Sequence, residues 1–148
     1  MISQIFHRNG FHAQLLILLL YFEKKFTIKF PFKILRKTII QGFYCSQIHP
    51  DSFIDIEAIC TLRLPHPYMI IIHRSAKIGH NCTIFHECTI GITEGNNLEA
   101  AILGNNVYVG CKSLILGHLK INDNVKIGAG AIVLKDVKEN ATIVGMWK

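Results

Sequence analysis

Residues 72–90 read IHRSAKIGHNCTIFHECTI, with an isoleucine at every sixth position (Ile72, Ile78, Ile84, Ile90). The same spacing extends backwards to Ile48 and, after one break, resumes from Leu103 to Val133. A period of six is neither the 3.6-residue period of a helix nor the alternation of an ordinary strand. It is typical of short strands joined by tight corners, three strands to each triangular coil. The sequence therefore predicts a left-handed parallel β-helix, an all-β solenoid of about five coils.

Residues with small side chains often lie four positions after the aliphatic ones. They are Ser52, Ala58, Ala76, Cys82, Cys88, Ser113 and Ala131. A thiol in such a slot behaves as a small buried hydrophobe, so we expect Cys82 and Cys88 to be buried. The five cysteines form no Cys-x-x-Cys pair and are odd in number. They indicate a reducing, cytoplasmic compartment rather than a disulfide scaffold.

Residues 1–46 differ in composition from residues 47–148. They hold seven basic side chains against one acid and seven of the nine Phe, whereas nine of the eleven Gly lie after residue 78. The apolar run from Leu15 to Phe22 is far shorter than the roughly 20 residues that a spanning helix needs. We expect a short helical segment over 1–46 that packs on a β-helix domain over 47–148.

Other roles for this basic, aromatic N-terminal segment stay open. One alternative is contact with anionic lipid at the inner face of the membrane, or with a lipid-linked substrate. Nucleic acid is allowed by the charge, but no recognised binding motif supports it.

The repeat breaks between Ile90 and Leu103. Residues 93–101 are polar and contain Gly and Asn, which predicts a loop over 92–102 that leaves the prism. Insertions from solenoids often lie on the functional face.

Several stretches resemble the serine acetyltransferase branch of the hexapeptide-repeat acyltransferases. They are residues 78–84, 89–91, 125–131, 133–137 and 141–145. The closing LKDV and NATIVG are more particular than the generic repeats. The resemblance covers about residues 47–146. It implies an enzyme that takes acetyl from acetyl-CoA, needs no metal, and works as a homotrimer.

The stretch LPHPYMIII over 64–72 resembles the segment that carries the general base of that family, and the base falls on His66. Counting strictly by six would place His66 inside the prism, where an unpaired imidazole is costly. Taking Leu64 as the inward residue places His66 at an exposed corner instead, which is the register that we predict. A base with a pKa near neutrality suits removal of a hydroxyl proton.

In the family an acid on the coil below orients this base. The matching position is Asp51 when counted without gaps and Gln47 by the Ile-His-Pro match, and Asp55 is a further candidate. His86 matches a polar residue near the site and is either a functional group or a coil-surface side chain. Pro65 stands where the family has Asp, which weakens any transfer of acceptor specificity.

The donor site follows from the resemblance too. Backbone N–H groups of Gly91 and Ile92 are expected to receive the oxyanion. The pantetheine arm of CoA needs small residues along a groove between subunits, since the backbone must come close. The matching positions are Cys111, Gly117, Gly128 and Ala129. Lysines that could meet the CoA phosphates are Lys126, Lys135 and Lys148.

The acceptor is the least constrained feature. No histidine occurs in 93–101, where serine acetyltransferases have a second functional one. Short relatives with this type of stretch are similar to O-acetyltransferases of capsules and O-antigens. We therefore expect acetyl transfer to a sugar hydroxyl of a bacterial surface polysaccharide or its precursor. The alternatives are a serine O-acetyltransferase of cysteine biosynthesis and an inactive β-helical assembly module.

Overall fold

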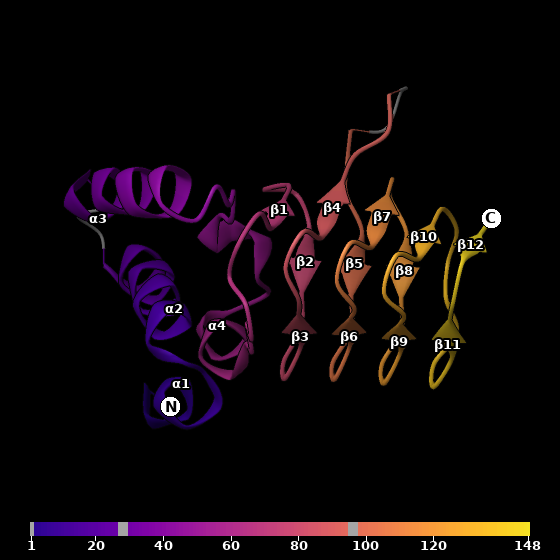
Figure 1. Cartoon of the computed structure of the whole chain (residues 1–148), viewed down its shortest axis with the longest axis horizontal. Helices are drawn as coiled ribbons and strands as arrows, with labels where there is room; N and C mark the ends of the chain where they lie inside the picture. The colour runs from indigo at the N-terminus through magenta and orange to yellow at the C-terminus, as the bar shows by residue number, and fades with distance from the viewer. Residues whose placement is uncertain (1, 27–29, 95–97) are drawn as a thin grey trace.

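A computed structural model describes residues 2–26, 30–94 and 98–148. Helices gather at the N-terminal end, and a prism of short strands extends from them to the C-terminus (Figure 1). The helices are α1 (Ile2–Arg8), α2 (Phe11–Lys25), α3 (Phe30–Arg36), the π-helical turn η1 (Lys37–Gln41), the 3-10 turn η2 (Pro50–Ser52) and α4 (Ile56–Thr61). No helix within these ranges is long and apolar enough to cross a membrane.

The strands of the described residues form three parallel sheets, and successive strands from β1 to β10 enter the three sheets in turn. The first sheet holds β1 (Ile71–Ile72), β4 (Thr89–Gly91), β7 (Leu114–Leu116), β10 (Ile132–Val133) and β12 (Met146–Trp147). The second holds β3 (Thr83–Ile84), β6 (Tyr108–Val109), β9 (Lys126–Ile127) and β11 (Thr142–Ile143). The third holds β2 (Lys77–Ile78), β5 (Ile102–Leu103) and β8 (Lys120–Ile121). The predicted left-handed β-helix with short N-terminal helices is confirmed.

The aliphatic residues at every sixth position line the inside of the prism from Ile72 onward. Each is 3% exposed or less: Ile72, Ile78, Ile84, Ile90, Leu103, Val109, Ile115, Ile121, Ile127 and Val133. Burial of one such side chain contributes about 1.5–3 kcal/mol. The prediction is wrong at Ile54, which is 48% exposed. Here η2 and α4 replace a regular coil, and the neighbouring Phe53 is buried and bridges to Ile78 instead.

The N-terminal helices share one hydrophobic core with the prism. Leu16, Ile17 and Leu20 of α2 are fully buried and belong to the same cluster as Leu62 and Ile70. Pairing with the first coil begins at a bridge from Gln47 to Ile71.

Cys82 and Cys88 are buried, as predicted. The Sγ–H of Cys88 donates to the Gly110 carbonyl at 3.0 Å, and that of Cys82 to the Gly104 carbonyl at 3.3 Å. Burial raises the pKa of Cys82 to about 11 and also raises the pKa of Cys88.

Alkylation of the native protein is expected to distinguish these two buried thiols from the exposed thiol of Cys45, since the thiolate is the reactive form. Cys45 is exposed and should react with iodoacetamide at pH 8, whereas Cys82 and Cys88 should react only after unfolding. Peptide mass spectrometry after timed alkylation gives the rate at each cysteine. Modification of Cys82 at the rate of Cys45 in the folded protein would contradict this packing.

Gly110 lies where two coils approach each other closely at a corner. A Cβ added there would lie 2.6 Å from the Ala129 nitrogen and 2.8 Å from the Gly128 carbonyl carbon. Because both are backbone atoms, Gly110→Ala must push the coils apart, and we expect a loss of about 1–3 kcal/mol of stability. Gly42→Ala is the control, since a Cβ there meets nothing within 4 Å. Urea unfolding of both variants measures the difference, and equal midpoints would contradict the close approach.

Candidate functional site

His66 lies at an exposed corner of the prism, as the Leu64 register predicts. Leu64 is fully buried, while His66 faces solvent. Arg63 forms a parallel bridge with Thr83, so this segment is laid against β3 as an incomplete coil. The imidazole is therefore presented from a fixed stretch of backbone.

Residues of the N-terminal segment hold the chain around His66. The Asn9 Oδ1 accepts a hydrogen bond from the Leu64 N–H at 2.8 Å, and the Asn9 Nδ2 donates to the Leu62 carbonyl at 2.9 Å. The Ser46 hydroxyl donates to the Pro67 carbonyl at 3.1 Å. Asn9 was not found from the sequence, because nothing in residues 1–46 repeats in register with the coils.

His86 lies against His66. Their ring centroids are 5.5 Å apart with the planes at 77°, an edge-to-face arrangement. The Nδ1 atom of His86 is buried and has no hydrogen-bond partner among the described residues, while its Nε2 lies 3.9 Å from the Glu87 carboxylate. Buried polar atoms are nearly always satisfied. An unsatisfied one beside an open hollow indicates a place for a ligand or water.

These two histidines open onto a hollow of about 310 Å³, here called the corner hollow. Its lining residues are His66, Tyr68, Met69, His86 and Glu87. On the neighbouring coil the Lys112 ammonium lies 3.6 Å from the Glu87 carboxylate. The hollow thus combines two imidazoles with one paired carboxylate.

Backbone strain is concentrated at this corner. At the opposite corner the residues with positive φ are all asparagines, namely Asn81, Asn106, Asn124 and Asn140. At the corner of His66 they include Met69 (φ 54°), Glu87 (φ 58°) and Lys112 (φ 58°). Such residues cost about 1–2 kcal/mol each in the left-handed region, whereas Asn tolerates it. Strained residues of this kind cluster at functional sites.

Three of the predicted cofactor residues lie on the same corner, one coil after another. The Lys112 N–H donates to the His86 carbonyl at 3.2 Å, and the Gly130 N–H donates to the Cys111 carbonyl at 2.8 Å. Cys111 and the pair Gly128–Ala129 are therefore stacked beyond His86; together with His66 they form what we call the corner column. Lys126 is exposed on β9, on the strand that leads into this corner.

Gly91, Ile92 and Gly117 lie elsewhere. Gly91 ends β4, at the end of the strand far from His86, and the Gly117 N–H donates to its carbonyl at 3.0 Å. Gly91 and Ile92 line a groove beside α3 rather than the corner hollow. Within one chain they lie away from His66. A single copy therefore does not place the expected oxyanion donors beside the proposed base.

The predicted orienting acids are engaged away from His66. Asp51 lies 3.3 Å from both His49 and Arg74. Asp55 caps α4 by accepting from the Ala58 N–H at 2.8 Å and pairs with His80 at 3.0 Å. Burial alone would raise the pKa of Asp55, but these two partners together hold it below its usual value. Within one chain, none of the described carboxylates forms an ion pair with His66.

The predicted loop leaves the prism after Ile92, and residues 95–97 of it lie outside the described residues. Its Glu99 approaches His118 at 3.2 Å, and the chain rejoins the third sheet at Ile102. Lys135 lies over the Trp147 ring at 4.5 Å. Within the described ranges no group of three or more His, Cys, Asp or Glu side chains is arranged to hold a metal ion.

Comparison with known proteins agrees with this architecture. Residues 100–135 match the family model of the bacterial transferase hexapeptide (six repeats). A serine acetyltransferase of Synechococcus elongatus is 37% identical over 84 residues, which are 56% of this chain and 34% of that protein. The putative colanic acid biosynthesis acetyltransferase WcaB of Escherichia coli (strain K12) is 33% identical over 95 residues, 62% of this chain and 59% of that protein.

A solved structure extends the likeness to three dimensions. The serine acetyltransferase of Neisseria gonorrhoeae, in complex with serine, has a TM-score of 0.66 and 30% identity over 90% of this chain and 53% of its own. The chain thus spans between about a third and three fifths of the relatives it matches. In its repeats and their winding the chain is similar to these acetyltransferases, and residues 100–135 carry the bacterial transferase hexapeptide repeat.

Proposed function

We propose that the chain is an acetyl-CoA-dependent O-acetyltransferase that modifies a sugar hydroxyl of a bacterial surface polysaccharide or its precursor. The observation that carries this proposal is the exposed imidazole of His66, packed edge-to-face against His86 in the corner hollow. The relatives named as acetyltransferases support the reaction class.

The reaction is a direct transfer within a ternary complex. His66 takes the proton of the acceptor hydroxyl as the hydroxyl oxygen attacks the thioester carbonyl carbon of acetyl-CoA. The tetrahedral intermediate collapses, the carbon–sulfur bond breaks, and the proton on His66 passes to the departing thiolate. The products are the acetyl ester and CoA.

His86 is proposed to act beside His66. Its imidazole lines the corner hollow, and its buried Nδ1 has no hydrogen-bond partner among the described residues. A bound acceptor, or a water that contacts it, would satisfy this atom. The small residues of the corner column, Cys111 and Gly128–Ala129, are proposed to let the pantetheine arm approach the backbone, and Lys126 to meet a CoA phosphate.

A second copy is proposed to complete the site in a homotrimer. Gly91, Ile92 and Asp51 lie away from His66 within one chain, so they can serve its reaction only from a neighbouring copy. Ile71, Ile102 and Tyr108 are exposed apolar side chains, one on each of the three sheets of the prism.

Serine is the second candidate acceptor, because serine acetyltransferases match the same coils at up to 37% identity among the relatives reported above. An inactive assembly module is the third candidate, and the pair of histidines in one open hollow argues against it.

Release of CoA thiol from acetyl-CoA discriminates between the three functions. L-serine is supplied to one reaction and sialylated or other bacterial glycans to the rest. We expect release with a glycan and none with serine. Release with serine alone would replace the sugar by serine as acceptor. No release with any acceptor, from folded protein, would support the inactive module.

A further inference from the structure

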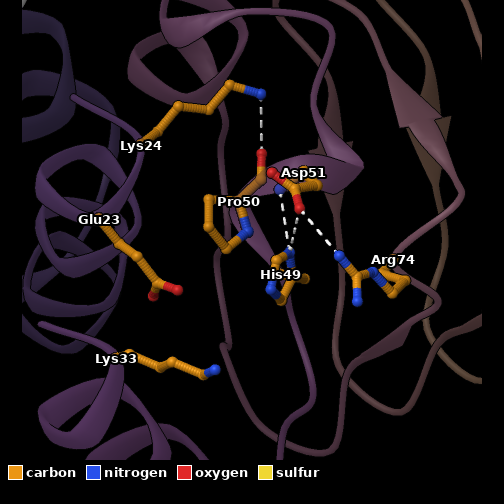
Figure 2. Close-up of a pocket in the computed structure, with 7 residues that line it drawn as sticks. All are labelled: Glu23, Lys24, Lys33, His49, Pro50, Asp51 and Arg74. Atoms are coloured by element: carbon orange, nitrogen blue, oxygen red, sulfur yellow. Dashed lines mark hydrogen bonds and ion pairs between the residues drawn. The ribbon is translucent and has the colours of Figure 1, made fainter. Parts of the chain in front are cut away.

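A groove lined with basic side chains runs between α3 and the first coils, on the side of the prism away from the corner hollow. It consists of two adjoining hollows of about 390 and 490 Å³ that share Lys33, His49 and Arg74. The larger one reaches Gly91 and Ile92. Figure 2 shows the smaller one, with Glu23, Lys24 and Lys33 on one side and His49, Asp51 and Arg74 on the other. We call the two together the basic groove.

The lining of the basic groove is strongly cationic. Its five cations are Lys24, Lys33, Arg36, Lys37 and Arg74, and its acids are Glu23 and Asp51, which leaves a net charge of +3. Both acids are already paired with an arginine, Glu23 with Arg36 and Asp51 with Arg74.

Two exposed lysines carry two of the three excess positive charges. Lys33 and Lys37 are four residues apart where α3 continues into η1, and both line the groove. Neither has an acidic partner in the part of the chain that the structure describes. Side chains at this spacing lie on one helix face, so the two ammonium groups can reach one ligand.

The wall that carries these lysines is fixed. Arg36 is 5% exposed and donates both to Glu23 and to the Ile48 carbonyl at 2.9 Å, which anchors α3 to the first coil. Opposite, the His49 Nδ1 accepts from the Asp51 N–H at 3.1 Å, which leaves its Nε2 to carry the proton and donate. A cationic wall facing a donor forms a built site for an anion.

We infer that the basic groove binds a phosphate or diphosphate group of a substrate. The inference rests on the proposed function for the source of that group, which is either a phosphorylated sugar acceptor or CoA. Of the predicted CoA positions, Cys111, Gly128 and Ala129 lie at another corner of the prism. Gly117 lies next to Gly91 but is not among the residues that line the groove. The phosphorylated sugar is therefore the expected source. The acceptor would then be an activated sugar rather than free serine.

Calorimetric titration of the full chain with inorganic pyrophosphate tests the binding without any acetyl transfer. Wild type should bind, and Lys33→Gln/Lys37→Gln should bind about tenfold or more weakly, because two charge-assisted contacts are lost. Lys33→Arg/Lys37→Arg should retain binding. Lys120→Gln/Lys138→Gln removes the same charge from exposed lysines outside the groove and should bind as wild type does. Circular dichroism checks that each variant is folded.

Competition identifies the source of the phosphate. We expect a nucleoside diphosphate sugar to displace pyrophosphate and CoA not to displace it. Displacement by CoA alone would assign the groove to the acetyl donor and overturn its assignment to a phosphorylated sugar. Absence of pyrophosphate binding, or equal binding by the Lys33→Gln/Lys37→Gln variant, would overturn the inference. His66→Gln should bind pyrophosphate with the affinity of the wild type. Loss of acetyl transfer and loss of phosphate binding can therefore be distinguished.

Discussion

His66→Gln is expected to lower kcat/KM for acetyl transfer by about 10²–10⁴-fold, the usual contribution of a positioned general base. Glutamine keeps the approximate size and polarity of the imidazole but takes up no proton near neutral pH. His66 is exposed at its corner, so the free energy of unfolding should change by less than about 0.5 kcal/mol. Initial rates of CoA release and a urea titration measure the two quantities on the same preparation.

His7→Gln is the matched control for this experiment. His7 is also exposed, but it lies on α1 and does not line the corner hollow. Its replacement should leave the rate unchanged. Equal rates for His66→Gln and wild type would remove His66 from the reaction, and a loss of rate that tracks a loss of folded protein would give it a structural role instead.

The largest effect on stability is expected at the buried ion pair of Arg36 and Glu23. The two residues are 5% and 3% exposed, and Arg36 also donates to the Ile48 carbonyl. Arg36→Met leaves the Glu23 carboxylate buried without its counter-charge, which should cost about 3–5 kcal/mol. The double variant Glu23→Leu/Arg36→Met removes both charges and should recover most of this loss. Urea unfolding followed by circular dichroism measures all three proteins.

Arg63→Met provides the comparison, because Arg63 is exposed and surface substitutions usually change stability by less than about 0.5 kcal/mol. If Arg36→Met cost no more than Arg63→Met, the buried pair would not be what anchors α3. A double variant as unstable as Arg36→Met would show instead that the lost packing of the arginine, rather than the unpaired carboxylate, causes the effect.

The coils could be predicted from sequence because each repeats the local geometry of the one before. Ile78, Ile84 and Ile90 all meet the same interior, so a period of six is enough to find them. The exception at Ile54 arises where the chain forms α4 instead. A local signal for that helix was present, since Asp55 caps it through the Ala58 N–H, and Asp is a favoured N-cap residue.

The site was predictable only in part, for a physical reason. His66 and His86 could be proposed from sequence because they occupy definable positions relative to the coils, and the Leu64 register placed His66 at the surface. The Asn9 contacts with the chain around His66 and the lysines of the basic groove depend on how residues 1–46 dock on the prism. That docking is a matter of tertiary packing, and no repeat in the sequence sets its register.

The most direct test of the central claim is to follow the label from radiolabelled acetyl-CoA incubated with wild-type chain and a hydroxyl-bearing glycan. Direct transfer with His66 as base predicts that the label appears as an acetyl ester on the glycan, with none on the protein. His66→Gln should transfer it at about a hundredth of the wild-type rate or less. Label retained on the protein would contradict direct transfer. Label remaining entirely in acetyl-CoA would contradict the sugar hydroxyl as the acceptor.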